Sequence, residues 1–308
     1  DLVKYYDFKI WVDCSLETAT RRGMRRDRYF HKNEQDYYWQ NIWMPNDKEF
    51  FESYRPDLVA DIKFSTEVDP IFSNPRLAAI YDAFDPDRSD LLPYIKIIND
   101  LHVNKAVDLG CGTGVFPLLL LEEGVGVVAV DPAAASIDIA RSKPNSNKIE
   151  WIVGDASSLV DISTDIVTMT GNVVQAIIEP KQWEMTLGHV GTALKPGGHF
   201  IFETRNPHFQ AWDQWNKKDS FQSISVPDIG KVDGWVELIK ADLPLVSFRW
   251  TYFFHKDSTT LTSDSTLRFR SLEEITKSLS NYGFEIEEVR EAPDRPGKEY
   301  VVIARKNN

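Results

Sequence analysis

Apolar and polar residues follow two different periods along the chain from about residue 76 onward. Short apolar runs predict buried strands at residues 106–109, 125–130, 149–153, 165–169 and 199–203. Apolar residues at helical spacing between these runs predict helices that start near Val115, Ala133 and Lys181, and Lys195-Pro196-Gly197-Gly198 ends the last of them. This alternation predicts a parallel α/β sheet with helices on both faces. In such a sheet the ligand crevice lies at the carboxyl ends of the strands.

The strand–helix alternation is interrupted between about residues 207 and 270. Residues there alternate with the period of a strand and predict three strands, at Trp235–Ile239, Ser247–Phe254 and Thr260–Phe269. A capping box at Ser271-Leu272-Glu273-Glu274 then predicts the start of a helix, and Gly283 predicts its end. We therefore expect an inserted β unit, followed by a return to the strand–helix pattern.

The first part of the chain has a different pattern. Residues 1–68 contain one short apolar run, Phe8–Val12, and helical pieces rich in aromatic residues. Asp69-Pro70 and Asn74-Pro75 follow, and such dipeptides favour turns and interrupt helices. We therefore expect a linker here that separates a segment at 1–68 from a larger domain at 69–308.

Composition and charge narrow the class of protein. The 308 residues are 42% hydrophobic and 27% charged, which is typical of a globular protein. The formal net charge of −12 argues against nucleic-acid binding, because attraction to phosphates needs a positive surface. The richest apolar stretch, Val115–Leu121, is too short to cross a membrane. Cys14 and Cys111 cannot form a disulfide framework, so we expect reduced thiols in a cytoplasmic protein.

The strongest chemical signal is the glycine loop, residues Asp108–Gly114, between the first predicted strand and helix. Its glycines at 110, 112 and 114 let the backbone turn sharply and approach a ligand closely. The following helix directs its N-terminus at this loop, which favours an anionic group there. The dinucleotide-binding fingerprint fails, because its third glycine is replaced by Val115. A glycine-rich turn that binds nothing is the structural alternative.

Acidic residues also close the next two predicted strands. Asp131 closes the second strand, where a carboxylate can accept hydrogen bonds from both hydroxyls of a ribose, or can act as a helix cap before Pro132. Gly154-Asp155-Ala156 closes the third strand and could bind an adenine amino group, or form a cap or turn. Three acids at the ends of successive strands, beside one glycine loop, favour an adenosine-containing ligand.

With these motifs, residues 76–308 resemble the class I S-adenosylmethionine (SAM)-dependent methyltransferases that act on small molecules. The matching pieces are the glycine loop, Asp131, Gly154-Asp155-Ala156, Leu194–Gly198, Gly283-Phe284 and the strand Tyr300–Ala304. The resemblance implies a Rossmann-like sheet of seven strands whose last strand is antiparallel. It also implies that the β insertion at about 207–270 forms an antiparallel cap over the active site, although its alternation fits a homodimer surface equally well.

The same resemblance implies SAM as the cofactor and assigns residues to it. Gly110 and Gly112 would lie against the methionine part, Asp131 would hold the ribose, and Asp155 with Ala156 would bind the adenine. The remaining candidates for this site are Asp108, Cys111, Gly114, Pro132 and Thr170. Tyr81 is a further candidate, because the segment before the glycine loop folds over the cofactor in related enzymes. Core packing at helical spacing is the alternative for Tyr81.

Candidates to contact the methyl acceptor follow the fourth and fifth predicted strands. Asn172 and Gln175 lie where related enzymes line the methyl-transfer site. Arg205, beside Asn206, could bind an anionic substrate in bidentate fashion or form a surface ion pair. Two further candidates, Trp212 and Trp215, are three residues apart, which predicts one face of a helix and either substrate contact or lid packing.

The sequence leaves the catalytic residue open. His208 and Arg205 are the candidates, although a lone histidine after a strand is more often structural. Alignment of nucleophile and methyl carbon can by itself supply about 7–11 kcal/mol. A general base is needed only if the accepting atom carries a proton that must leave.

The segment before residue 69 resembles the C-terminal part of uridine-kinase-like P-loop proteins. Asp7–Asp13 and the following residues to Arg28 carry this resemblance, and Arg21, Arg22, Arg25 and Arg26 would match an arginine-bearing lid over phosphates. A solvated helix face is the alternative. The phosphate-loop motif G-x-x-x-x-G-K-[ST] is absent from the sequence, which argues against phosphoryl transfer.

We therefore expect a methyltransferase of class EC 2.1.1.- that transfers a methyl group from SAM to a small-molecule acceptor. We expect no metal, nucleic-acid or membrane partner. The alternatives are a kinase-like fusion protein whose kinase half is incomplete in this sequence, and a SAM-binding module without catalysis.

Overall fold

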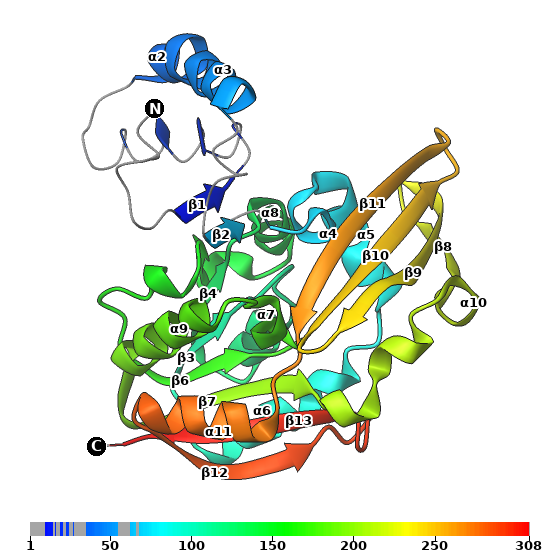
Figure 1. The fold of residues 1–308 in the computed structure, drawn as a ribbon. Coiled ribbons are helices and arrows are strands. Elements are labelled where there is room, and N and C mark those ends of the chain that lie inside the picture. The colour runs from blue at the N-terminus through cyan, green and yellow to red at the C-terminus, as the bar shows by residue number, and fades with distance from the viewer. Residues whose placement is uncertain are drawn as a thin grey trace. The chain divides into compact units, whose positions relative to one another are not determined.

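The computed structural model describes residues 10–14, 16, 19–20, 23–24, 27, 35–54, 62–65 and 68–307. The chain divides into two units, Asp1–Val68 and Asp69–Asn308 (Figure 1). In the first unit, β1 (Ile10–Asp13) pairs in parallel with β2 (Ile62–Ser65). A continuous helical segment comprises α2 (Asp36–Tyr38), η2 (Trp39–Trp43) and α3 (Met44–Tyr54). The four arginines of the predicted lid, Arg21, Arg22, Arg25 and Arg26, lie outside the described residues.

The second unit is built on a seven-stranded sheet. Its strands are β3 (Lys105–Leu109), β4 (Gly126–Asp131), β5 (Glu150–Val153), β6 (Thr164–Met169), β7 (Leu194–Arg205), β12 (Phe284–Glu291) and β13 (Glu299–Lys306). In space they follow the order β12-β13-β7-β6-β3-β4-β5. Strand β13 is antiparallel to both of its neighbours, β12 and β7. The neighbouring strands among β7, β6, β3, β4 and β5 all pair in parallel. The predicted Rossmann-like sheet with an antiparallel last strand is therefore confirmed.

Helices cover both faces of this sheet. One face packs against α6 (Leu92–Asp100), α7 (Val115–Glu122) and α8 (Ala134–Ser142), and the other against α9 (Pro180–Ala193) and α11 (Leu272–Asn281). Successive side chains of a strand point to opposite faces. Phe200 and Phe202 of β7 accordingly pack with Trp183 of α9, whereas Ile201 joins the cluster of α6 and α7.

The predicted β insertion forms a separate four-stranded antiparallel sheet, the cap sheet (Figure 1). Its strands are β8 (Gln222–Val226), β9 (Gly230–Asp242), β10 (Leu245–Phe254) and β11 (Thr259–Arg268). The sequence did not predict β8, which is short and largely polar. The cap sheet packs against α4 (Pro70–Ser73) and α5 (Pro75–Phe84). Gly234 permits this contact, because a Cβ there would lie 2.6 Å from the ring of Phe84.

The Asp-Pro and Asn-Pro dipeptides directly follow the boundary between the two units, and each begins a helix. Pro70 and Pro75 occupy the first turns of α4 and α5, and the Asn74 side chain accepts the N–H of Arg76. Proline suits the start of a helix, because the N–H that it lacks would have no intrahelical partner there. Helix α4 ends at Ser73 and the extended Asn74 separates it from α5, so the predicted interruption at Asn74-Pro75 is confirmed.

Helix α9 ends at Ala193, just before the segment Lys195–Gly198, so the predicted helix end is confirmed. This segment belongs to β7, where the register against β6 shifts from the pair Thr164–Leu194 to the pair Ile166–His199. This is an irregularity within a strand, and the positive φ of Gly197, +74°, accommodates it.

Shorter elements connect these parts. They are η4 (Ser89–Leu91), η5 (Ser146–Lys148), η6 (Ala156–Ser158), η7 (Val173–Ala176), η8 (Pro207–Phe209), η9 (Ala211–Gln214) and α10 (Lys217–Ser220). Among the helices that the structure describes, none is long and apolar enough to span a membrane.

Candidate functional site

The glycine loop connects the end of β3 to the start of α7. Gly110, Gly112 and Gly114 all have positive φ, at +84°, +53° and +81°. A Cβ on Gly110 would lie 2.4 Å from Val173, and one on Gly114 would lie 2.5 Å from the Trp151 ring. A Cβ on Gly112 would meet no atom of the described residues within 4 Å. Two glycines therefore serve close packing, whereas the third faces space that a ligand can fill.

Asp131, at the end of β4, contacts this loop directly. Its Oδ2 accepts the N–H of Gly112 at 2.8 Å, and its Oδ1 accepts the N–H of Ala133 at 2.8 Å. The side chain is buried, and burial raises its pKa. Each carboxylate oxygen has a second lone pair, so both can still accept a ribose hydroxyl. The neighbouring Pro132 is exposed.

Asp108 closes β3 and is almost completely buried. Its Oδ1 accepts the Thr168 hydroxyl at 2.8 Å. Burial raises the pKa of Asp108 to about 7, because the charged form loses its hydration. Cys111, in the glycine loop, is also buried, and burial raises the pKa of its thiol.

Asp155 caps a short helix. Its Oδ1 accepts both the N–H and the hydroxyl of Ser157, at 2.8 and 2.6 Å, at the start of η6. Ala156 is buried behind it. The structural alternative for Asp155 is thus realised, and contact of Asp155 and Ala156 with an adenine stays a prediction.

Helix α5 is bonded to the glycine loop through Asp82, which the sequence did not single out. Asp82 accepts the Thr113 hydroxyl at 2.5 Å and pairs with Lys143 at 2.6 Å. The preceding residue, Tyr81, packs against Phe72 at a ring distance of 5.6 Å. Burial raises the pKa of Tyr81, and the nearby charges of Arg88 and Arg205 oppose that rise. Tyr81 therefore has the packing contact of the structural alternative, and its contact with a cofactor stays a prediction.

The predicted acceptor residues Asn172, Gln175 and Arg205 form one buried network. Arg205 is paired across strands with Glu299 of β13, and its Nε lies 3.8 Å from that carboxylate. Gln175 accepts Arg205 Nη1 at 3.0 Å, and Asn172 donates Nδ2 to Glu299 at 3.0 Å. Thr170 is buried at the start of the same loop.

These contacts settle which way the two amides point. Glutamate can only accept from Asn172, and arginine can only donate to Gln175. Asn172 Oδ1 and Gln175 Nε2 are then a buried acceptor and a buried donor that have no partner within the described part of the chain. Such groups need a ligand or water to avoid an energetic penalty.

Asn206 and the two tryptophans have structural contacts. Asn206 accepts the N–H of His208 and donates to the Gly297 carbonyl. Trp212 and Trp215 lie in and directly after the 3₁₀-helix η9 and not on the predicted helix face, because three-residue spacing also aligns side chains in a 3₁₀ turn. Both pack on Phe269, at ring distances of 4.8 and 6.4 Å.

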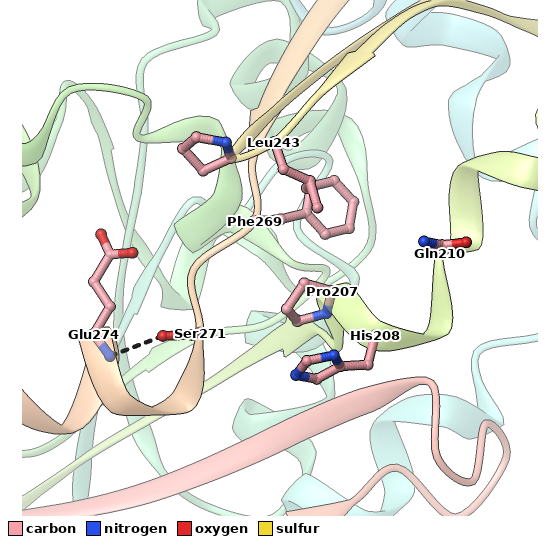
Figure 2. Close-up of a pocket in the computed structure, with 8 residues that line it drawn as sticks. Pro207, His208, Gln210, Leu243, Phe269, Ser271 and Glu274 are labelled. Carbon is pink, nitrogen blue, oxygen red and sulfur yellow. Dashed lines mark hydrogen bonds between the residues drawn. The ribbon is translucent and has the colours of Figure 1, made fainter.

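His208 lines a pocket of about 470 Å³. The pocket lies between the segment after β7, the turn between β9 and β10, and the start of α11. Figure 2 shows His208 and Pro207 opposite Ser271 and Glu274, with Phe269 beside Leu243. Within the described part of the chain, no three His, Cys, Asp or Glu side chains are placed to share a metal ion.

The sequence analysis missed the charged residues that complete the acceptor network, Glu203, Glu299 and Arg295, and the tyrosine Tyr94. Glu203 accepts the Tyr94 hydroxyl, and Arg295 lies 3.6 Å from Glu203 and 3.1 Å from Glu299. Tyr94, Glu203 and the pair Arg295 and Glu299 are far apart along the chain, and no local motif connects them.

Comparison with known proteins finds a family that matches part of this chain and a relative that is similar to it. Residues 106–198 match the family described as a methyltransferase domain (Methyltransf_25). Over 118 residues the chain is 34% identical to the cypemycin N-terminal methyltransferase of a Streptomyces species, a match that covers 38% of this chain and 48% of that protein. The chain thus spans about half the length of this relative.

Solved structures show the same fold. A SAM-dependent methyltransferase from Clostridium acetobutylicum is similar with a TM-score of 0.61 and 20% identity, over 76% of this chain and 98% of that one. SAM-bound CalS10, an amino pentose methyltransferase from Micromonospora echinaspora, has a TM-score of 0.56 and 16% identity, over 74% of this chain and 97% of that one. Residues 69–308 therefore have the fold of SAM-dependent methyltransferases.

Proposed function

We propose that this protein transfers a methyl group from SAM to a small-molecule acceptor, an activity of class EC 2.1.1.-. The observation that carries the proposal is the geometry of the glycine loop: three glycines with positive φ, bonded through the Gly112 N–H to the carboxylate that closes β4. The match of residues 106–198 to a methyltransferase domain supports the same activity.

The proposal assigns the following residues to the cofactor. The open side of Gly112 takes the methionine part together with Gly110, and Asp131 accepts the ribose hydroxyls. Asp155 and Ala156 contact the adenine. Asp108, Cys111, Gly114, Pro132, Thr170 and Tyr81 complete the surroundings of the cofactor. SAM supplies a methyl group that its sulfonium already activates.

The protein then has to orient the acceptor and exclude water. Asn172 Oδ1 and Gln175 Nε2 offer the acceptor one hydrogen-bond acceptor and one donor, and Arg205 fixes the position of Gln175. Trp212, Trp215 and Asn206 support the segment that follows Arg205. Holding the nucleophile in line with the methyl group is the main contribution of these residues. His208 serves as a base only if the accepting atom loses a proton during transfer.

Calorimetry with SAM tests the cofactor site. Asp131→Ala removes the ribose acceptor and the bond to Gly112, and should weaken SAM binding by about tenfold or more. Asp138→Ala changes an exposed carboxylate on α8 and serves as the matched control. Equal affinity in the Asp131 variant and in wild type would contradict the ribose position. Formation of S-adenosylhomocysteine during an acceptor screen would exclude a binding module without catalysis.

We also propose that residues 1–68 are a kinase-like segment that does not catalyse phosphoryl transfer. We further propose that the protein works in the cytoplasm, and that a homodimer is one of the forms in which it can assemble. The parallel pairing of β1 with β2 supports an α/β origin of this segment, and a sequence with only two cysteines, too few for a disulfide framework, supports a reducing compartment. Thermal unfolding with millimolar Mg-ATP tests the proposal on residues 1–68. The melting temperature should stay unchanged, because ATP bound at a kinase site would raise it.

A further inference from the structure

Two buried carboxylates lie where β7 ends and β13 begins. Glu203 and Glu299 are 1% and 3% exposed. Glu203 Oε1 accepts two successive backbone N–H groups, those of Gly171 and Asn172, at 2.5 and 3.2 Å. Its other oxygen accepts the Tyr94 hydroxyl. A carboxylate is a stronger acceptor for such N–H groups than a neutral side chain. Glu203 thus holds the turn that directly follows β6.

This turn has a backbone conformation that needs support. Gly171 and Asn172 have φ values of +66° and +59°, and a non-glycine residue in the left-handed region persists only where its surroundings hold it. Three contacts hold Asn172. Glu203 accepts its N–H, Glu299 accepts its side-chain amide, and its carbonyl accepts the N–H of Gln175.

Val173, the residue after Asn172, connects this turn to the glycine loop. Val173 fills the space beside Gly110, since a Cβ on Gly110 would lie 2.4 Å from Val173 Cγ1. The far end of the same segment is held by Arg270, which donates to the carbonyls of Val174 and Ile177 at 3.0 and 2.6 Å. A displacement of Asn172 would therefore also displace Val173, whose side chain packs against Gly110.

We propose that Glu203 is a positioning residue for the cofactor site, acting through Asn172 and Val173 on Gly110. The inference rests on the proposed function, because it assigns the glycine loop to SAM. Burial and the nearby Glu299 raise the pKa of Glu203, and Arg295, which lies near both carboxylates, opposes that rise. Glu203 itself touches no reacting group in this scheme.

Substitutions at Glu203 separate positioning from simple support of the fold. Glu203→Ala removes both amide contacts, and should weaken binding of S-adenosylhomocysteine, measured by calorimetry, about tenfold. It should also speed hydrogen exchange of the Gly171 and Asn172 amides about tenfold. Glu203→Gln keeps a carbonyl acceptor for these amides, and should bind within about threefold of wild type. Such a rescue is not expected if Glu203 only stabilises the fold through its charge.

Tyr94→Phe is the matched control, because it removes the partner of the other carboxylate oxygen and leaves the amide contacts in place. It should lower the melting temperature and leave the affinity within about twofold. A folded Glu203→Ala protein that binds S-adenosylhomocysteine as wild type does would overturn the proposal. If that variant does not fold, Val173→Ala decides, because it removes the contact with Gly110 without disturbing a charge. Unchanged affinity in Val173→Ala overturns the proposal, and weakened affinity supports it.

Failure of the proposed function gives a different result. If wild type binds neither SAM nor S-adenosylhomocysteine, the cofactor assignment is wrong. Hydrogen exchange of Gly171 and Asn172 in Glu203→Ala then still shows whether Glu203 holds this turn. Unchanged exchange of the two amides would overturn the positioning role by itself.

Discussion

The two halves of the site are held in place by different forces. In the cofactor half, which comprises residues 108–114 and Asp131, the loop depends on glycine backbone conformation and on close apolar packing against Val173 and Trp151. In the proposed acceptor half, which comprises residues 170–175 with Glu203, Arg205, Arg295 and Glu299, buried carboxylates and partly exposed arginines hold the loop. The first half should therefore be sensitive to added atoms, and the second to a lost charge.

The buried carboxylates of the two halves are also stabilised differently. Asp108 in the cofactor half accepts a threonine hydroxyl, whereas Glu299 in the acceptor half lies beside Arg205 and Arg295. A buried carboxylate without a close cation is stabilised by taking up a proton. The cofactor half should accordingly respond to pH in the neutral range.

The largest expected effect is the pH dependence caused by Asp108. Its pKa is about 7 in the folded protein, against about 3.9 for an unfolded aspartate. Between these values the folded state binds more protons than the unfolded state. The contribution of Asp108 to the free energy of unfolding therefore falls as the pH rises from about 4 to about 7, by about 4 kcal/mol in total. Asp108→Asn should remove this contribution and make the pH dependence of stability less steeply falling than in wild type, as urea unfolding across that range measures.

Asp155→Asn provides the control for this pH series, because it changes an exposed carboxylate of the same region. Its stability should follow the wild-type curve. The same slope in Asp108→Asn as in wild type would show that Asp108 does not cause the pH dependence.

A somewhat smaller effect is expected from Gly110→Ala. The new Cβ meets Val173 and sits on a residue with φ of +84°, so the free energy of unfolding should fall by about 3 kcal/mol. Gly112→Ala also places alanine at a positive φ, but its Cβ would not clash with the described residues. It should lower the free energy of unfolding by about 1 kcal/mol. Equal losses in the two variants, measured by urea unfolding, would mean that packing against Val173 does not support this loop.

The smallest effect tests the acceptor half. Arg295→Met leaves Glu203 and Glu299 without their shared cation and should lower the free energy of unfolding by about 2 kcal/mol. This loss is smaller than for a fully buried pair, because Arg295 is partly exposed. The control is Arg305→Met, which loses an exposed pair with Glu287 and should cost about 0.5 kcal/mol or less. If both variants have wild-type stability, charge does not hold the acceptor half.

Much of the cofactor half could be predicted because its residues are close in sequence. The glycine loop follows one strand directly, and Asp131 closes the strand that pairs beside it. Strand periodicity and glycine spacing thus indicate where these residues meet. The bond between Thr113 and Asp82 lies in the same half, but it joins residues of separate elements and was not predicted.

Local rules also left open which of two permitted structures forms where tertiary contacts decide. Asn74-Pro75 ends α4 as expected, and it also begins α5, and both helices pack on the cap sheet. The segment Lys195–Gly198 can turn or continue as a strand, and it lies within β7 between the paired residues Leu194 and His199. Composition and spacing alone are the same for both outcomes.

The amino-acid sequence by itself determined the alternating sheet, the place of the glycine loop and the acid at the end of β4, because each depends on neighbours within a few residues. Only the tertiary structure decided that Glu203, Glu299, Arg295 and Tyr94 surround Asn172. Charged side chains from distant segments are brought together by the pairing of β7 with β13 and by packing of α6 on the sheet, and their attraction depends on distance in space and not on separation along the chain.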